Sequence, residues 1–259
     1  MGRRKPDWLS RCCYYVSNTC YEPVQIFRFA NMRDRAMKRL LQMKDKYPVR
    51  ILDFLLHPDG FRLLLDAKHP GQISEAMRFF SGVTSQEYRQ RKQHDGPVWR
   101  SRYNITLVEK GAQALRCALN MDFAMTRTGD PYLFHPLLWK HSGHLDLTGV
   151  RKRYRCVDFK AVNRCFADMP KDEFHEWYIN ATNHKFDFGE YVAEEWWEEA
   201  LAVGSRELCE RIADTMSRKW FRLCAYPAPG TVPGLEHAIS YTIITAKKRK
   251  REYILSYAQ

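Results

Sequence analysis

The chain has 259 residues, of which 45% are hydrophobic and 14% aromatic, a composition that excludes a disordered protein. No apolar run reaches the roughly 18 residues of a membrane span, and the basic N-terminus lacks a signal peptide's apolar segment. We therefore expect a cytoplasmic protein without a membrane partner. Residues 1–150 hold 24 basic and 14 acidic side chains and so carry +10 of the net charge of +12, which indicates a polyanion partner, nucleic acid first.

The first 125 residues predict the order β-α-β-β-α-β, followed by a further helix. The predicted strands are 13–18, 49–57, 61–66 and 98–109, and the predicted helices are 31–47, 71–93 and 112–125. This order is that of an α+β fold with a ferredoxin-like split βαβ antiparallel sheet. Two helices would cover one face of the sheet, which leaves the other face for a ligand or partner.

We place a domain boundary after residue 149, so that residues 1–149 form the ferredoxin-like domain and residues 150–259 a mainly helical accessory region. The stretches KDEFHEWYI, EEWWEEA and SRELCERIADTM predict short helices in the second region. Pro170 is expected near the start of the first, and Ser205 is expected to cap the last, with Leu208 and Ile212 on its buried side.

The eight cysteines include no CxxC pair, so the sequence does not predict a zinc site built on such pairs. In a reducing compartment most of them should be small buried thiols. His135, His141, His144 and Asp146 form a loose cluster with HxxH spacing, for which a metal site is the alternative to a set of exposed polar residues.

Several stretches together resemble the REP-associated tyrosine transposases, which are single-tyrosine transposases of the HUH nuclease superfamily. They are YYVSNTCYEPVQIF, LLHPDGFRLLLD with ISEAMRFFSG, GPVWRSRYNITLVE, ALRCALNMDFA and WWEEALAVGSRELCERIAD. The resemblance covers most of the chain. It implies an HUH transposase-like catalytic domain, usually dimeric, that binds single-stranded DNA or DNA hairpins, so a homodimer is a further expectation.

The catalytic motifs of that family are degenerate here. The family has Pro-Asn-His-x-His where this chain has Pro58-Asp59-Gly60-Phe61-Arg62, and Cys117 stands where the resemblance places the nucleophilic tyrosine. Glycine has no donor atom and arginine is a permanent cation, so neither residue binds a metal. We expect no catalytic residue and no metal site, with Mg or Mn as cofactor only if the chain is an enzyme.

Arg62 instead places a fixed positive charge where the metal would lie, which suits a grip on a phosphate oxygen; the alternative is a solvated strand residue. Tyr14, Tyr15, Trp99 and Tyr103 are candidates for stacking on bases, although aromatics in strands more often form core. The predicted DNA-binding residues are Arg3, Arg4, Lys5, Arg62, Arg89, Arg91, Lys92, Arg100, Arg102 and Tyr103.

The sequence thus predicts a protein that recognises single-stranded or hairpin DNA without transposase catalysis. One alternative is an active transposase that nicks DNA in transposition and recombination with a rearranged nucleophile, Cys117 or a nearby tyrosine. Another is an RNA-binding adaptor, which also suits the charge and the sheet.

Overall fold

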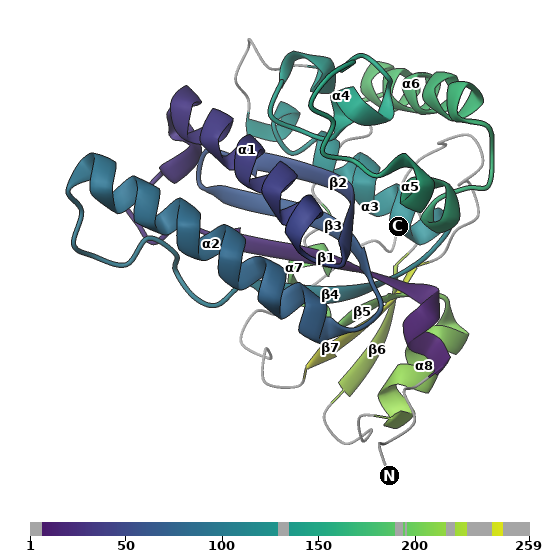
Figure 1. The fold of residues 1–259 in the computed structure, drawn as a ribbon. Helices are drawn as coiled ribbons and strands as arrows, with labels where there is room; N and C mark the ends of the chain where they lie inside the picture. Colours follow the sequence, from purple (N-terminus) through teal and green to yellow (C-terminus); the bar gives the residue numbers. More distant parts are fainter. Residues whose placement is uncertain are drawn as a thin grey trace.

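The strands that the structure describes form one seven-stranded sheet in the order β2-β3-β1-β4-β5-β7-β6. The computed structural model describes residues 7–128, 135–189, 194, 196–215, 221–226 and 240–245 (Figure 1). The first four strands are β1 (Cys12–Thr19), β2 (Val49–His57), β3 (Gly60–Ala67) and β4 (Asn104–Glu109). β1 lies between β3 and β4 and β3 pairs with β2, all antiparallel, which confirms the ferredoxin-like arrangement.

Helices α1 (Ala30–Lys46) and α2 (Pro70–Lys92) pack side by side on one face of this sheet (Figure 1). Their apolar residues recur at helical spacing, as Met32, Ala36, Leu40 and Met43 do on α1, so each helix buries a single face. Between the sheet and α2, the Phe61 ring of β3 packs edge to face on the Phe80 ring of α2, with 5.2 Å between the ring centres. Both helices were predicted to within one residue of their observed ends.

The opposite face of the sheet is covered as well, so the expectation of an open face is wrong. α3 (Ala112–Asp122) contacts β2, β3 and β4, while α7 (Trp196–Glu199) contacts β1 and β4. The hydroxyl of Thr106, on β4, donates to the carbonyls of Trp197 and Ala200, at 2.8 and 2.7 Å. The α7 segment lies some ninety residues further along the chain, a distance over which strand periodicity gives no information.

The predicted strand 98–109 is extended only in its second half. Residues 98–103 form a loop, apart from an isolated bridge between Trp99 and Cys20. The amide of Arg100 donates to the Thr19 carbonyl at 2.9 Å, which ties this loop to the end of β1. The short helical turns are η1 (Asp7–Arg11), η2 (Ile26–Arg28), η3 (Thr126–Thr128) and η4 (Pro136–Leu138).

The second region has the expected helices and also extends the sheet. Its helices are α5 (Phe159–Cys165), α6 (Lys171–Asp187), α7 and α8 (Arg206–Thr215), and the short α4 (His144–Leu147) lies just before the boundary. Its strands are β5 (Ala202–Gly204), β6 (Phe221–Tyr226) and β7 (Ser240–Thr245). β5 pairs in parallel with β4 and thereby covers an edge that would otherwise expose unpaired backbone groups.

The smaller predictions for this region hold. α6 begins directly after Pro170, and the Leu208 amide donates to the Ser205 hydroxyl at 3.3 Å, as expected of an N-cap. One apolar core includes residues on both sides of residue 149. The domain boundary that we placed there therefore stays a prediction. Among the described residues, no helix has the length and apolar character that crossing a membrane requires.

Candidate nucleic-acid interface

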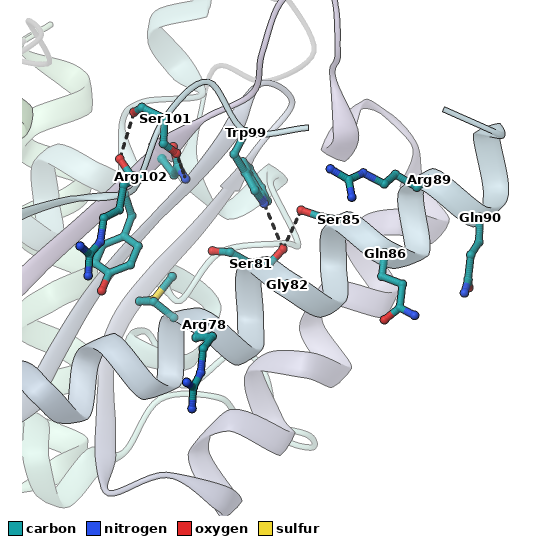
Figure 2. Close-up of a pocket in the computed structure, with 13 residues that line it drawn as sticks. Arg78, Ser81, Gly82, Ser85, Gln86, Arg89, Gln90, Trp99, Ser101 and Arg102 are labelled. Carbon is teal, nitrogen blue, oxygen red and sulfur yellow. Dashed lines mark hydrogen bonds between the residues drawn. The ribbon is translucent and has the colours of Figure 1, made fainter. Parts of the chain in front are cut away.

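A groove with a volume of about 490 Å³ runs between α2 and the loop 98–103, at the end of β1 (Figure 2). We call it the α2 groove. The thirteen described residues that line it include three arginines and neither aspartate nor glutamate. They are Asn18, Met77, Arg78, Ser81, Gly82, Ser85, Gln86, Arg89, Gln90, Trp99, Ser101, Arg102 and Tyr103. The charged side chains that line the groove are therefore all positive.

Gly82 lies in the wall of the α2 groove, in the interior of a helix of 23 residues. Glycine there costs the helix about 1 kcal/mol relative to alanine. Packing within the chain does not demand it, because a Cβ built at Gly82 would meet no described atom within 4 Å. The missing side chain leaves open space beside Ser81 and Ser85 (Figure 2), which a ligand backbone is able to fill.

The loop side of the groove is held against α2 by side-chain hydrogen bonds. The Trp99 Nε1 donates to the Ser81 carbonyl at 3.0 Å (Figure 2), and the Tyr103 hydroxyl donates to the Ser74 hydroxyl at 3.2 Å. The Asn18 amide donates to the Ser101 carbonyl at 3.2 Å, which attaches the loop to β1. The groove is thus pre-formed, and binding need not order the loop.

The polar groups along the groove supply further donors. The Ser81 hydroxyl is buried and has no hydrogen-bond partner among the described residues. The Ser85 hydroxyl donates to the Ser81 carbonyl at 2.7 Å. Gln86 and Gln90 are exposed on the same wall. The Ser81 hydroxyl is too buried to reach a ligand and the Ser85 hydroxyl is already engaged, so the donors open to phosphate oxygens are the two glutamine amides and the three guanidinium groups.

The structure brings only some of the predicted DNA-binding residues together. Arg89, Arg102 and Tyr103 line the α2 groove. Arg91, Lys92 and Arg100 are exposed near it without lining it. Arg3, Arg4 and Lys5 lie outside the described residues.

Sequence reasoning missed the other α2 residues that line the groove, among which Arg78 carries the positive charge. A signal for them is present in the sequence. Positions 78, 82, 85, 86, 89 and 90 are polar or glycine at helical spacing, opposite the apolar face of Ile73, Met77 and Phe80. The periodicity that predicted the helix therefore also contains its polar stripe.

Two of the stacking candidates are unavailable to a base. Tyr14 and Tyr15 are fully buried within β1. The Trp99 ring packs at 5.2 Å from the ring of Phe61, edge to face, and only part of it reaches the groove. The half-buried Tyr103 ring carries the Arg102 guanidinium at 5.7 Å from its centre, which leaves it as the stacking candidate in the groove.

Arg62 lies away from the α2 groove, on the sheet face that α7 covers, and its charge is not free. Its Nε donates to Glu198 Oε1 at 2.8 Å, while its Nη1 is buried without a partner among the described residues. Burial alone would lower the pKa of Arg62, but the Tyr15 hydroxyl and the Glu198 carboxylate raise it above its ordinary value. A phosphate would have to displace Glu198 to use this cation, so the predicted grip stays a prediction.

The residues around Arg62 do not fit a divalent cation or a nucleophile. Cys117 is fully buried, and burial raises the pKa of its thiol well above the ordinary value, so the reactive thiolate does not form. Burial likewise raises the pKa of Tyr15 well above its ordinary value. At position 60 a Cβ would lie 2.1 Å from the Asn18 carbonyl oxygen, so the close approach of β1 and β3 requires glycine and excludes histidine.

The four residues of the candidate metal cluster do not share one site. Each has a different partner: His135 bonds Asn183, His141 bonds Asp34 and Arg33, His144 bonds Asp122, and Asp146 bonds Arg151. Within the described ranges, no group of three or more histidine, cysteine or acidic side chains has the geometry of a metal site. The cysteines are buried as expected, apart from the half-buried Cys224.

A second basic hollow, of about 800 Å³, lies at the other end of the sheet but is largely self-neutralised. Asp66 accepts from Lys110 at 3.0 Å and from Arg164 at 3.2 Å. Arg50 lies 3.5 Å from Asp158. The α2 groove is therefore the better candidate for a polyanion, because its arginines face no acidic lining residue.

Comparisons with known proteins give a similarity in structure alone. No protein-family model matches the chain, and no curated protein matches it. Among solved structures, that of a REP-associated tyrosine transposase bound to a REP hairpin is similar, with 12% sequence identity and a TM-score of 0.43. The match covers 62% of this chain and 96% of the other. At this level the similarity carries no inference about function.

Proposed function

We propose that this protein binds nucleic acid, single-stranded or hairpin DNA, in the α2 groove and does not cleave it. The observation that carries the proposal is a pre-formed groove with three arginines, no acidic lining residue and a glycine that opens the helix wall. Arg78, Arg89 and Arg102 would neutralise phosphates, and the exposed side chains of Gln86 and Gln90 would bond phosphate or sugar oxygens.

Binding without cleavage follows from the chemistry on the other face of the sheet. Strand transfer needs an activated nucleophile and a group that stabilises charge on the phosphate. Cys117 is a buried, protonated thiol, and Arg62 is paired with Glu198. Neither group lines the α2 groove, and the hydroxyl groups that do line it have no histidine, aspartate or glutamate among the lining residues to activate them.

Fluorescence anisotropy with labelled oligonucleotides tests the binding proposal. Single-stranded DNA, hairpin DNA and hairpin RNA of the same sequence are titrated with the parent and with Arg78→Ala, Arg89→Ala and Arg102→Ala. Each variant should bind about 5- to 100-fold more weakly, the range for a lost charge-assisted contact of ~1–3 kcal/mol. Arg35→Ala, which removes an exposed cation from α1 outside the groove, is the control and should change affinity less than about twofold.

Three outcomes would contradict parts of the proposal. Equal losses for Arg35→Ala and the groove variants would show a diffuse electrostatic attraction rather than a groove. Tighter binding of hairpin RNA than of hairpin DNA would favour the RNA-binding alternative. For cleavage, labelled hairpins are incubated with the protein and Mg or Mn. We expect intact DNA, and a covalent protein–DNA adduct would show an active transposase instead.

A further inference from the structure

The loop between α4 and α5 presents an exposed aromatic residue in an unfavourable backbone conformation. Tyr154 is 80% exposed, and its φ of 54° places it in the left-handed region. A bulky residue other than glycine rarely adopts that conformation, and strain of this kind is typical of sites that bind or switch. The chain thus maintains two costs at one position, a strained backbone and an apolar ring in water.

The base of this loop is rigid, so the exposure of Tyr154 does not come from a loose segment. The Arg151 guanidinium donates to Asp146 Oδ1 at 2.7 Å and to the Ser142 carbonyl at 3.1 Å. Arg155 Nε donates to the Arg151 carbonyl at 2.6 Å, and Lys44 Nζ of α1 donates to the Arg155 carbonyl at 3.3 Å. One end of the turn is therefore fixed to the buried Asp146 and Ser142 and the other to the half-buried Lys44, and its tip projects outward.

The tip is also positively charged. Lys152 and Arg153 precede Tyr154, are both exposed, and form no ion pair or side-chain hydrogen bond with the described residues. No aspartate or glutamate occurs from Thr148 to Cys156. Two unpaired cations beside one exposed ring provide both elements of single-strand recognition, phosphate neutralisation and stacking on a base.

We propose that Lys152, Arg153 and Tyr154 form a second contact for single-stranded nucleic acid, in which Tyr154 stacks on an unpaired base and the two cations hold the adjoining phosphates. This inference rests on the proposed nucleic-acid binding. The contact is separate from the α2 groove: α1 packs against α2 on one side and reaches the loop through Lys44 on the other (Figure 1). A strand that engages both sites therefore crosses α1.

The test uses single-stranded DNA with one 2-aminopurine base, and a blunt duplex of the same sequence. Tyr154→Ser should bind the single strand about tenfold or more weakly and should lose the quenching of 2-aminopurine, with an unchanged salt slope, since stacking displaces no counterion. Tyr154→Trp should retain both affinity and quenching. The duplex has no free base, so its affinity should not respond to Tyr154→Ser.

Charge and exposure need separate controls. A double variant, Lys152→Ala with Arg153→Ala, should flatten the salt dependence of single-strand binding while leaving some quenching. Phe188→Ser removes another strongly exposed aromatic residue, 68% exposed at the end of α6, and should leave binding unchanged. Circular dichroism spectra should be the same for all variants, because none of the changed side chains is buried.

The outcomes separate this inference from the proposed function. Parent-like binding and quenching by Tyr154→Ser, with the losses expected for the groove arginines, would overturn the second contact and keep the groove. No binding of any oligonucleotide by the parent would overturn both. Vesicles of phosphatidylserine and phosphatidylcholine serve as a further probe, and Tyr154-dependent binding to them without oligonucleotide binding would show a membrane surface as the occupant instead.

Discussion

At the scale of single residues, Gly82 shows how a local cost marks a candidate site. We expect Gly82→Ala to raise the free energy of unfolding by about 1 kcal/mol, because alanine favours the helix and its Cβ meets no atom of the chain. Urea denaturation measures this change. Lower stability of Gly82→Ala would mean that the helix wall is tighter than described.

The same position also tests the α2 groove. Gly82→Leu should fold as well as Gly82→Ala but bind DNA at least about tenfold more weakly, because its side chain fills the space beside Ser81 and Ser85. Anisotropy titrations of both variants give the comparison, in which Gly82→Ala controls for helix propensity. Equal affinities of the two would show that the ligand does not approach this wall.

Asp53 is a second informative residue, because its carboxyl is fully buried on β2. Burial, reinforced by the nearby Asp122, raises the pKa of Asp53 well above the ordinary value. The folded state therefore holds a proton that the unfolded state releases, so stability falls as pH rises above the ordinary aspartate pKa of about 4. Asparagine keeps the Oδ1 that accepts from the Phe54 amide at 2.8 Å and has no proton to lose.

We therefore expect the stability of Asp53→Asn, relative to the parent, to increase steadily as pH rises from 4 to 7. Denaturation at several pH values measures the difference. Asp45→Asn, which changes an exposed carboxylate on α1, should give a profile parallel to that of the parent. A parallel profile for Asp53→Asn would mean that the Asp53 carboxyl is ionised in the folded protein.

At the scale of elements, the pair Arg62–Glu198 joins β3 to α7 across 136 positions of sequence. Both side chains are partly exposed, at 25% and 38%, so their interaction should be modest. A double-mutant cycle of Arg62→Ala and Glu198→Ala should give a coupling in unfolding free energy on the order of 1 kcal/mol. Zero coupling would mean that packing and the Thr106 hydrogen bonds hold α7 without a contribution from this pair.

The same variants decide what Arg62 does for binding. Because Arg62 faces α7 rather than the α2 groove, we expect Arg62→Ala to bind DNA within about twofold of the parent. A grip on phosphate would give a different pattern. Arg62→Ala would then weaken binding by about 5- to 100-fold, and Glu198→Gln would tighten it by removing a competing carboxylate.

At the scale of the whole molecule, the charge imbalance between the two regions predicts a salt dependence. Each phosphate neutralised on a single strand contributes about −0.7 to the slope of log affinity against log salt, so the three groove arginines alone give roughly −2, and Lys152 and Arg153 would steepen it. Titrations between roughly 50 and 200 mM salt should show this fall in affinity. A flat response would point to a protein partner instead of nucleic acid.

The sequence by itself determined the elements and their order in the first 125 residues. Apolar residues at helical or alternating spacing mark α1, α2 and the β2–β3 hairpin, because burial of one face is a local property that each segment encodes alone. The ferredoxin-like arrangement follows from that order. The sequence also singled out Arg89, Arg102 and Tyr103, which line the α2 groove, since basic and aromatic residues in adjacent segments are visible without a structure; their contact with DNA stays a prediction.

Only the tertiary structure decided which charges remain free and which surfaces remain open. Glu198 neutralises Arg62, and the α7 segment covers the face that was expected to bind a ligand. Gly60 is required by the Asn18 carbonyl on a neighbouring strand, whereas Gly82 meets nothing and opens the groove. Each of these facts depends on contacts between segments far apart in the chain, and periodicity within a segment holds no information about them.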